Sequence, residues 1–283
     1  MVKRKTVADF IAMKSTGEKI AMLTAYDASM AALLAGCGVD ALLVGDSLGM
    51  VVLGYDSTVP VTMDEMIHHA AAVRRGAPGA FVIGDMPFGS YQCSPRDAII
   101  NGGRFLKEAG CDAVKLEGGL EVCATVAAMV AAGISVMGHV GLTPQTATQL
   151  GGYKVQGRDL ESARKMVAAA KGLQEAGAFG LVLECIPDQL ARIISETLSI
   201  PTIGIGAGVH CDGQVLVTHD LLGMFEKFIP SFVKTYTSLA PLIKENVTHY
   251  AEEVRKGSFP DAAHSFITQM DLGELLDQKK PGV

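Results

Sequence analysis

Charged side chains stand at the ends of short apolar runs at four distant places in the sequence. Asp46 follows the run "ALLVG", Asp85 ends "FVIGD", and Glu184 ends "GLVLE". The run "AVKLE" carries Lys115 and Glu117 two residues apart, so on a strand both side chains would point to the same face. Carboxylates crowded without matching cations repel each other, and a hard divalent cation relieves that repulsion. These residue types and spacings predict a buried cation site that also accepts an anionic substrate.

The expected metal is Mg²⁺, because oxygen ligands without a nearby cluster of Cys or His side chains favour Mg²⁺ over Zn²⁺. We expect Asp46 and Asp85 to lie nearest to the metal and Glu117 to reach it directly or through a water molecule. Lys115 would then be a fixed cation for an anionic substrate. The alternative for Lys115 is a buried salt bridge to Glu117 or Asp85, and the two roles are compatible.

Two more polar side chains at the ends of apolar runs are candidates for proton transfer. Glu184 precedes "CIP", and its apolar setting suits a general base. Alternatively, Glu184 could hold a metal-binding side chain in place. His139, in "MGHVGLTPQ", could donate a proton, contact substrate or be a hydrogen-bonded polar residue at the barrel mouth. The last apolar run ends at His219 and Asp220. A single carboxylate at the end of a strand commonly caps the next helix, so the convergence of several carries the prediction.

A unit that recurs along the chain explains how these side chains could meet. In "AGCGVDALLVGD", "AGCDAVKLEG" and "AGAFGLVLEC", a helix would end at glycine and a short turn would lead to an apolar strand with a carboxylate at its end. Eight runs are expected to be strands: 20–25, 41–45, 81–85, 113–117, 134–138, 181–184, 202–206 and 215–220. They predict an α/β fold, a (β/α)8 TIM barrel, in which all C-terminal strand ends meet at one mouth. A doubly wound open sheet is the rival arrangement.

The segments between these runs support the alternation of strands and helices. Thr62 and Glu65 have the spacing of a capping box, and Ser94 followed by Pro95 is typical of a helix start. No linker divides the chain. We therefore expect residues 1–283 to form a single barrel domain, with an N-terminal helix and a C-terminal helical extension that closes the barrel or makes subunit contacts.

Composition narrows the class of protein. The 283 residues are 49% hydrophobic and 19% charged, enough to bury one large core, and the net charge of -6 argues against a nucleic-acid partner. Six scattered cysteines without a C-x-x-C pair suit a reducing cytoplasm, and the N-terminus lacks the apolar core of a signal peptide. The run "VCATVAAMVAAGISVMGHVG" is broken by "AAGIS" and predicts a buried helix, a turn and a strand rather than a membrane span.

The longer motifs around these residues resemble one known family. They are "VGDSLGMVVLGYDSTVPVTMDEM", "GDMPFGSY", "VKLEGG", "GHVGLTPQ", "LVLECIP", "IGIGAG" and "DGQVLVTHDLLG". From about residue 3 to about residue 265 the chain is similar to the ketopantoate hydroxymethyltransferase family. The resemblance implies a Mg²⁺-dependent (β/α)8 barrel, usually a homodecamer in bacteria. Such an enzyme transfers a one-carbon unit from 5,10-methylenetetrahydrofolate to 3-methyl-2-oxobutanoate, giving 2-dehydropantoate in the first committed step towards pantothenate.

The resemblance also implies roles for individual residues. Asp46 and Asp85 would be metal ligands, and Glu117 would complete the metal site. Asp46, Ser47, Asp85 and Lys115 would hold the keto acid. The folate-binding residues have no motif that can be read from the sequence, and the subunit number rests on the family alone.

The implied base is Glu184, which would remove the C3 proton so that an enolate, stabilised by Mg²⁺ as a Lewis acid, attacks the folate-borne carbon. An alternative enzyme is a Mg²⁺-dependent 2-oxo-acid lyase of the phosphoenolpyruvate mutase and isocitrate lyase group. Such lyases typically carry a Cys in a "KKCGH"-like loop, which this sequence lacks. A non-catalytic, metal-binding barrel is the remaining alternative. The role of His139 and the order of chemical steps, including any free formaldehyde, stay open.

Overall fold

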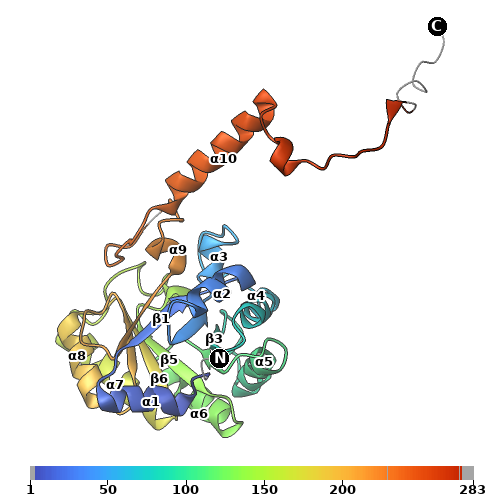
Figure 1. Ribbon diagram of the computed structural model, residues 1–283. Helices are drawn as coiled ribbons and strands as arrows, with labels where there is room; N and C mark the ends of the chain where they lie inside the picture. Colours follow the sequence, from blue (N-terminus) through green and yellow to red (C-terminus); the bar gives the residue numbers. More distant parts are fainter. Residues whose placement is uncertain (1–3, 228, 274, 276–283) are drawn as a thin grey trace. The chain divides into compact units, whose positions relative to one another are not determined.

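The computed structural model describes residues 4–227, 229–273 and 275, which divide into two compact units between Thr237 and Ser238. Among the described residues, all the strands lie in the larger unit, and Figure 1 shows helices around them. The smaller unit holds the helix α10 (Leu239–Lys256) and the 3-10 turn η3 (Ala262–His264). The prediction of one domain over the whole chain stays a prediction.

Eight parallel strands close into a barrel in the order of the sequence. Each strand pairs with the next, and the last pairs with the first through partners such as Ile20 and Gly213. The strands are β1 (Ile20–Thr24), β2 (Ala41–Val44), β3 (Phe81–Asp85), β4 (Ala113–Lys115), β5 (Val136–Gly141), β6 (Gly180–Glu184), β7 (Thr202–Ile205) and β8 (Gly213–Leu216). Every residue of β2, β3 and β4 is buried, as expected of parallel strands covered on both faces. The (β/α)8 barrel is therefore confirmed.

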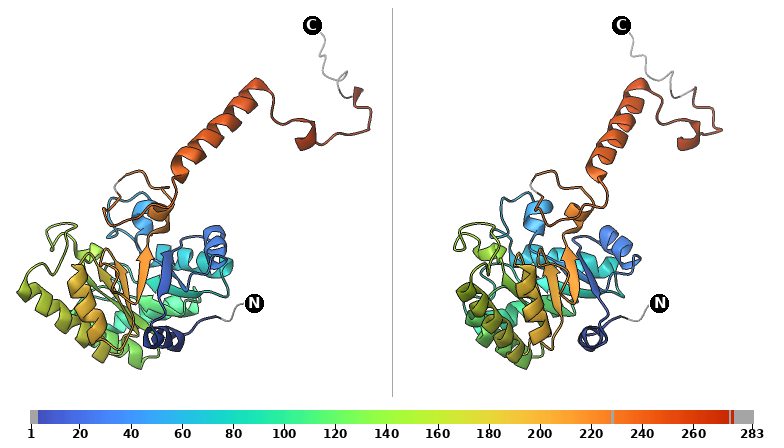
Figure 2. Two further views of the ribbon diagram at one scale, coloured as in Figure 1. Left: turned by 60° about the vertical axis from the view of Figure 1, so that its left-hand side comes forward. Right: turned by 90° about the vertical axis from the view of Figure 1, so that its left-hand side faces the viewer.

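Helices alternate with the strands and cover the outside of the barrel (Figure 2). They are α1 (Val7–Thr16), α2 (Ala28–Ala35), α3 (Leu48–Val51), α4 (Met63–Gly76), α5 (Pro95–Lys107), η1 (Leu120–Val122), α6 (Cys123–Ala131), η2 (Pro144–Thr146), α7 (Leu160–Glu175), α8 (Asp188–Thr197) and α9 (Thr218–Leu221). The predicted capping box is confirmed at α4, where the Glu65 carboxylate accepts from Thr62 N at 2.7 Å and Glu65 N donates to Thr62 Oγ1 at 3.2 Å. Ser94 caps α5, as predicted. These caps fix where the helices begin after the strand-end loops.

Helix α1 fills the end of the barrel at which the strands begin. The Phe10 ring lies 4.8 Å from the Phe81 ring, edge to face, and 6.4 Å from the Phe179 ring, measured between centroids. Phe10 and Met13 are buried in a core that includes Ile20 at the start of β1. Burying each of these two side chains contributes about 1.5–3 kcal/mol to stability, which holds α1 against this end of the barrel. The functional side chains are left to the opposite end, where the strands finish.

Several strand boundaries differ from the prediction, most of all in β4, β5 and the last strand. Strand β4 ends at Lys115, so Glu117 lies just past the strand rather than on it. The last strand ends at Leu216 rather than at residue 220, because Thr218 begins α9. The Thr218 hydroxyl donates to Thr24 O at 2.5 Å, and its backbone N–H donates to Thr24 Oγ1 at 3.0 Å, which ties α9 to the end of β1. Strand β5 begins and ends later than expected, so His139 lies inside the strand rather than after it.

The helix of the smaller unit, α10, has apolar side chains that stay exposed within the described residues. They are Leu242, Ile243, Val247, Tyr250 and Val254, with exposed fractions of 46–59%. From Ile243 onward they follow one another at three or four residues, with Leu242 next to Ile243, which places them along one face of the helix. Among the helices that the structure describes, none has the length and apolar character needed to cross a membrane.

Candidate active site

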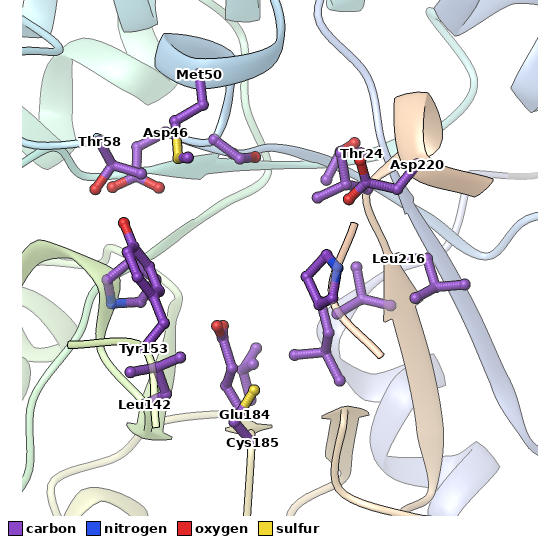
Figure 3. Close-up of a pocket in the computed structure, with 18 of the residues that line it drawn as sticks. Thr24, Asp46, Met50, Thr58, Leu142, Tyr153, Glu184, Cys185, Leu216 and Asp220 are labelled. Atoms are coloured by element: carbon purple, nitrogen blue, oxygen red, sulfur yellow. The ribbon is translucent and has the colours of Figure 1, made fainter. Parts of the chain in front are cut away.

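The C-terminal ends of the strands surround a pocket of about 340 Å³ (Figure 3). Every side chain expected at the site lines this pocket: Asp46, Ser47, Asp85, Lys115, Glu117, His139 and Glu184. They come from β3, β4, β5 and β6, from the segment after β2 and from the segment just past β4. The geometry thus brings the candidate residues together, as expected if strand ends of a barrel share one mouth.

Lys115 is the centre of a buried charge cluster. Its Nζ lies 2.7 Å from Asp85 Oδ1, 3.9 Å from Glu117 Oε1 and 3.3 Å from His139 Nδ1. Burial alone would lower the pKa of the Lys115 ammonium, but the charges of Asp85, Glu117 and Asp46 outweigh burial and raise that pKa. The salt bridge considered as an alternative for Lys115 is therefore present, and the charged side chain also lines the pocket.

Two residues that the sequence did not single out hold the carboxylates in place. Gln145, on η2, donates from Nε2 to Asp46 Oδ2 at 2.9 Å and from its backbone N–H to Glu117 Oε2 at 3.1 Å. The Tyr91 hydroxyl accepts from Glu117 N at 3.1 Å and lies 2.8 Å from Gln145 Oε1. Both side chains are buried. Their only mark in the sequence is their position in the motifs "GHVGLTPQ" and "GDMPFGSY".

His139 connects two of the candidate carboxylates. Its Nδ1 lies 3.5 Å from Glu117 Oε1, and its Nε2 lies 3.3 Å from Glu184 Oε2. Burial and the Lys115 charge lower the pKa of His139, but the carboxylates of Glu117 and Glu184 outweigh them and raise it to about 9. The protonated ring can donate toward both carboxylates. Glu184, whose side chain is 16% exposed, lines the pocket wall within ion-pair distance of this ring.

The carboxylates of Asp46 and Asp85 lie in a setting with excess negative charge. Burial is the largest cause that raises the pKa of each, and the neighbouring charges of Asp85 and Glu117 raise the pKa of Asp46 further. Asp46 N donates to Asp85 Oδ2 at 3.2 Å. Burial also acts to raise the pKa of Glu117, but His139, Lys115 and the Gln145 N–H outweigh it and lower that pKa.

This donor set fits a hard cation that keeps several ligands of its own. The described residues contain no group of three or more His, Cys, Asp or Glu side chains arranged to hold a metal ion. Mg²⁺, however, usually takes only one or two carboxylates and completes its shell with water and substrate oxygens. Asp46 and Asp85 can supply those carboxylates. Glu117 is engaged by Gln145 and His139, which favours a contact through water.

The rest of the pocket wall differs in character from this cluster. Ser47 Oγ lies 2.8 Å from the Tyr26 hydroxyl. Figure 3 shows Thr24 and Asp220 on the side of the cavity away from Asp46 and Tyr153. Asp220 does line the pocket, as its place at the end of the last apolar run suggested. His219 next to it packs against Tyr26 instead, with 5.4 Å between ring centroids.

Comparison with known sequences identifies the family. A model of the ketopantoate hydroxymethyltransferase family matches residues 4–262. A relative named 3-methyl-2-oxobutanoate hydroxymethyltransferase, from Desulfotalea psychrophila, is 66% identical over 96% of this chain and 98% of its own length. One of the same name from Carboxydothermus hydrogenoformans is 59% identical over 96% of this chain and 99% of its own length.

Comparison with solved structures gives the same barrel. The chain is similar to a phosphonopyruvate hydrolase in complex with oxalate and Mg²⁺, with a TM-score of 0.59 and 12% identity over 97% of this chain and 96% of that one. It is also similar to 2,3-dimethylmalate lyase, a member of the PEP mutase/isocitrate lyase superfamily. The TM-score is 0.57, with 16% identity over 98% of each chain. At such low identity this similarity shows the fold alone.

Proposed function

The chain belongs to the ketopantoate hydroxymethyltransferase family, and from that premise we propose the reaction and the role of each residue. The enzyme transfers a hydroxymethyl unit from 5,10-methylenetetrahydrofolate to 3-methyl-2-oxobutanoate and gives 2-dehydropantoate, the first committed step towards pantothenate. The observation that carries this proposal is one pocket in which Glu184, held by His139, borders a cluster of Asp46, Asp85 and Lys115 suited to an anionic 2-oxo acid.

The keto acid binds at the charged cluster. The Lys115 ammonium supplies the positive charge that its carboxylate needs, and the Ser47 hydroxyl supplies a hydrogen bond. Asp46 and Asp85 would hold Mg²⁺, and Glu117 would support the metal site. When bound, Mg²⁺ acts as a Lewis acid that draws electron density from the 2-oxo group and makes the C3–H bond more acidic. Gln145 and Tyr91 keep the carboxylates oriented before substrate arrives.

Glu184 is the general base that removes the proton from C3. Its Oε2 lies 3.3 Å from His139 Nε2, so a protonated His139 ring keeps the carboxylate close to the pocket. In the overall reaction, the C3–H bond breaks and a bond forms between C3 and the donor's methylene carbon. The two bonds from that carbon to folate nitrogens break. Water supplies the new hydroxyl, and its remaining proton and the C3 proton end on the two nitrogens of tetrahydrofolate.

Proton exchange at C3 tests this proposal without the folate donor. The NMR signal of the C3 proton of 3-methyl-2-oxobutanoate should disappear in D₂O when enzyme and Mg²⁺ are present. EDTA should stop the exchange, and excess Mg²⁺ should restore it. If no exchange occurs, adding tetrahydrofolate tests whether the base acts only in the ternary complex; no exchange in that case either would contradict the assigned keto acid.

The lyase alternative is disfavoured by family membership and by the missing "KKCGH"-like sequence. Similarity to a lyase in fold does not support lyase chemistry at 16% identity. Cleavage of 2-methylisocitrate at a rate typical of metabolic enzymes would nevertheless overturn the proposed reaction. A non-catalytic barrel would bind the keto acid without turnover under any folate supply.

We also propose a cytoplasmic homo-oligomer, with the decamer suggested by family resemblance. The exposed apolar face of α10, which includes Leu242, Val247 and Tyr250, suits a contact between subunits. The six free cysteines suit a reducing compartment. Sedimentation equilibrium of the full chain measures the subunit number, and a monomer at micromolar concentration would contradict the assembly.

A further inference from the structure

The pocket contains a buried carboxylate that the proposed mechanism does not use. Asp220, on α9, is 7% exposed and lines the cavity (Figure 3). Its Oδ1 has no hydrogen-bond partner among the residues that the structure describes. Burial raises the pKa of Asp220 to about 6. A buried, unsatisfied carboxylate destabilises the folded protein, so its place at a pocket wall points to a ligand that supplies hydrogen-bond donors.

The backbone around Asp220 holds this carboxylate at the wall. Asp220 N donates to Val217 O at 3.1 Å, and Gly223 N donates to Asp220 O at 3.2 Å. The hydrogen bonds between Thr218 and Thr24 anchor the start of the same helix to β1. The segment is therefore tied at both ends of α9, and Asp220 is kept at the wall without its side chain being satisfied.

The surroundings of Asp220 restrict the kind of ligand. Figure 3 places Leu216 and Thr24 on the same side of the cavity as Asp220. The chain segments around α9 also bring apolar side chains to the pocket: Val217, Phe225, Phe232 and Val233. An anionic keto acid would be repelled by Asp220 and attracted by Lys115 in the other part of the pocket. A flat, uncharged ligand with two adjacent N–H donors suits a carboxylate that can accept two parallel hydrogen bonds between apolar walls.

We propose that Asp220 binds the pyrimidinone edge of the pterin ring of the one-carbon donor by accepting from its 2-amino group and its N3–H. This assignment rests on the proposed function, which identifies the donor as a reduced folate. It gives the pocket two separate binding regions. The charged cluster takes the keto acid, and the wall formed by Asp220 and its apolar neighbours takes the pterin ring, so that the carbon to be transferred lies between them.

The test compares tetrahydrofolate with its 2-desamino-2-methyl analogue, which lacks one of the two donors. Both are titrated anaerobically into the full-length enzyme with Mg²⁺, in the wild type and in Asp220→Asn. Asparagine keeps the size of the side chain but presents a donor where an acceptor is needed. Tetrahydrofolate should bind about 10- to 100-fold more weakly to Asp220→Asn. The wild type should bind the analogue about 10-fold more weakly than it binds tetrahydrofolate. The variant should bind the analogue and tetrahydrofolate with about the same affinity.

A neighbouring carboxylate provides the matched control. Asp27 accepts from Met30 N at 2.9 Å as the N-cap of α2 and does not line the pocket. Asn caps a helix as well as Asp does, so Asp27→Asn should leave the affinity for tetrahydrofolate unchanged. Asp220→Leu, which removes both acceptors, should weaken binding at least as much as Asp220→Asn.

The outcomes separate this assignment from the proposed function. Equal affinity of wild type and Asp220→Asn for tetrahydrofolate, or an equal loss with the analogue in both proteins, would overturn the role of Asp220 and leave the reaction intact. Absence of both C3 exchange and donor turnover in the wild type would overturn the reaction, and the pterin assignment with it.

Discussion

In the part of the chain that the structure describes, buried charges are paired on one wall of the pocket and unpaired on another. On the wall built by β3 to β6, Lys115 pairs with Asp85, and His139 lies between Glu117 and Glu184. On the wall built by α9, Asp220 Oδ1 has no such partner within the described residues. A paired charge can stay buried before any ligand arrives, whereas an unpaired one raises the free energy of the ligand-free protein.

This difference suggests that one wall of the cavity serves catalysis and the other serves ligand recognition. The paired wall is an electrostatic environment organised before substrate binds, which is what lowers the barrier of a reaction. Asp220 Oδ1 has no hydrogen-bond partner among the described residues, and under the proposal above a bound ligand supplies it, so this wall would serve recognition. Substitutions in the first wall should therefore reduce rate and stability, and substitution of Asp220 should reduce the affinity for one ligand while stabilising the ligand-free protein.

The largest effect should follow from Glu184→Gln. Glutamine keeps the shape and the contact with His139 but cannot accept a proton from C3. The rate of C3 exchange, followed by NMR in D₂O, should fall by about 10²- to 10⁴-fold. The exposed Glu175 serves as control, because Glu175→Gln removes a carboxylate outside the pocket and should leave exchange unchanged. Wild-type exchange in folded Glu184→Gln would rule out the assigned base.

The next effect should come from Lys115→Met, which removes the ammonium at the centre of the paired wall. Asp85 and Glu117 would then be buried without it, so the free energy of unfolding should fall by about 3–5 kcal/mol in denaturant titrations. Lys115→Met combined with Asp85→Asn should recover part of that loss, because the double variant no longer buries the unpaired Asp85 charge. A double variant as unstable as the sum of its parts would contradict the pairing.

A smaller effect is expected for Gln145→Leu. The substitution removes the donors to Asp46 Oδ2 and Met86 O but keeps the backbone N–H that binds Glu117. Leaving buried acceptors without donors should lower the free energy of unfolding by about 1–3 kcal/mol, measured at the pH of the activity assay. Gln149, an exposed glutamine nearby in the sequence, provides the control Gln149→Leu. If both variants unfold alike, Gln145 does not organise the wall.

The smallest effect concerns the pH dependence of Asp220. Folding raises its pKa from 3.8 to about 6, so the folded state favours the protonated form. That contribution to stability is complete below about pH 4 and is lost as the pH rises through 6. Ligand-free Asp220→Asn should therefore be more stable than the wild type by about 1–2 kcal/mol at pH 8, with the difference shrinking towards pH 5. A difference independent of pH would mean that Asp220 is satisfied in solution.

The barrel and its charged strand ends could be read from the sequence because buried parallel strands leave unbroken apolar runs. The runs before Asp46, Asp85 and Glu184 were each predicted to be strands, and the structure has a strand at each. The last strand was placed wrongly because the apolar run beginning at Val215 continues past the end of β8, while Gly213 and Gln214 at its start give no apolar pattern.

The residues that organise the carboxylates could not be found in this way. Gln145 binds Asp46, which is 99 residues away in the sequence, and Tyr91 binds Glu117 across 26 residues. Neither follows an apolar run as the strand-end acids do. Their roles depend on which loops meet above the barrel, and hydrophobic periodicity carries no information on that. The lack of a partner for Asp220 is likewise a property of its neighbours in space.

The aromatic contact of Phe10 with Phe81 and Phe179 bears on how the enzyme could be inhibited. With that end of the barrel filled, the pocket formed by the described residues lies at the strand C-termini, and reactants would enter and products leave there. An inhibitor bound at the mouth of this pocket would not need to resemble either reactant. It would block access of the keto acid and of the proposed folate donor together.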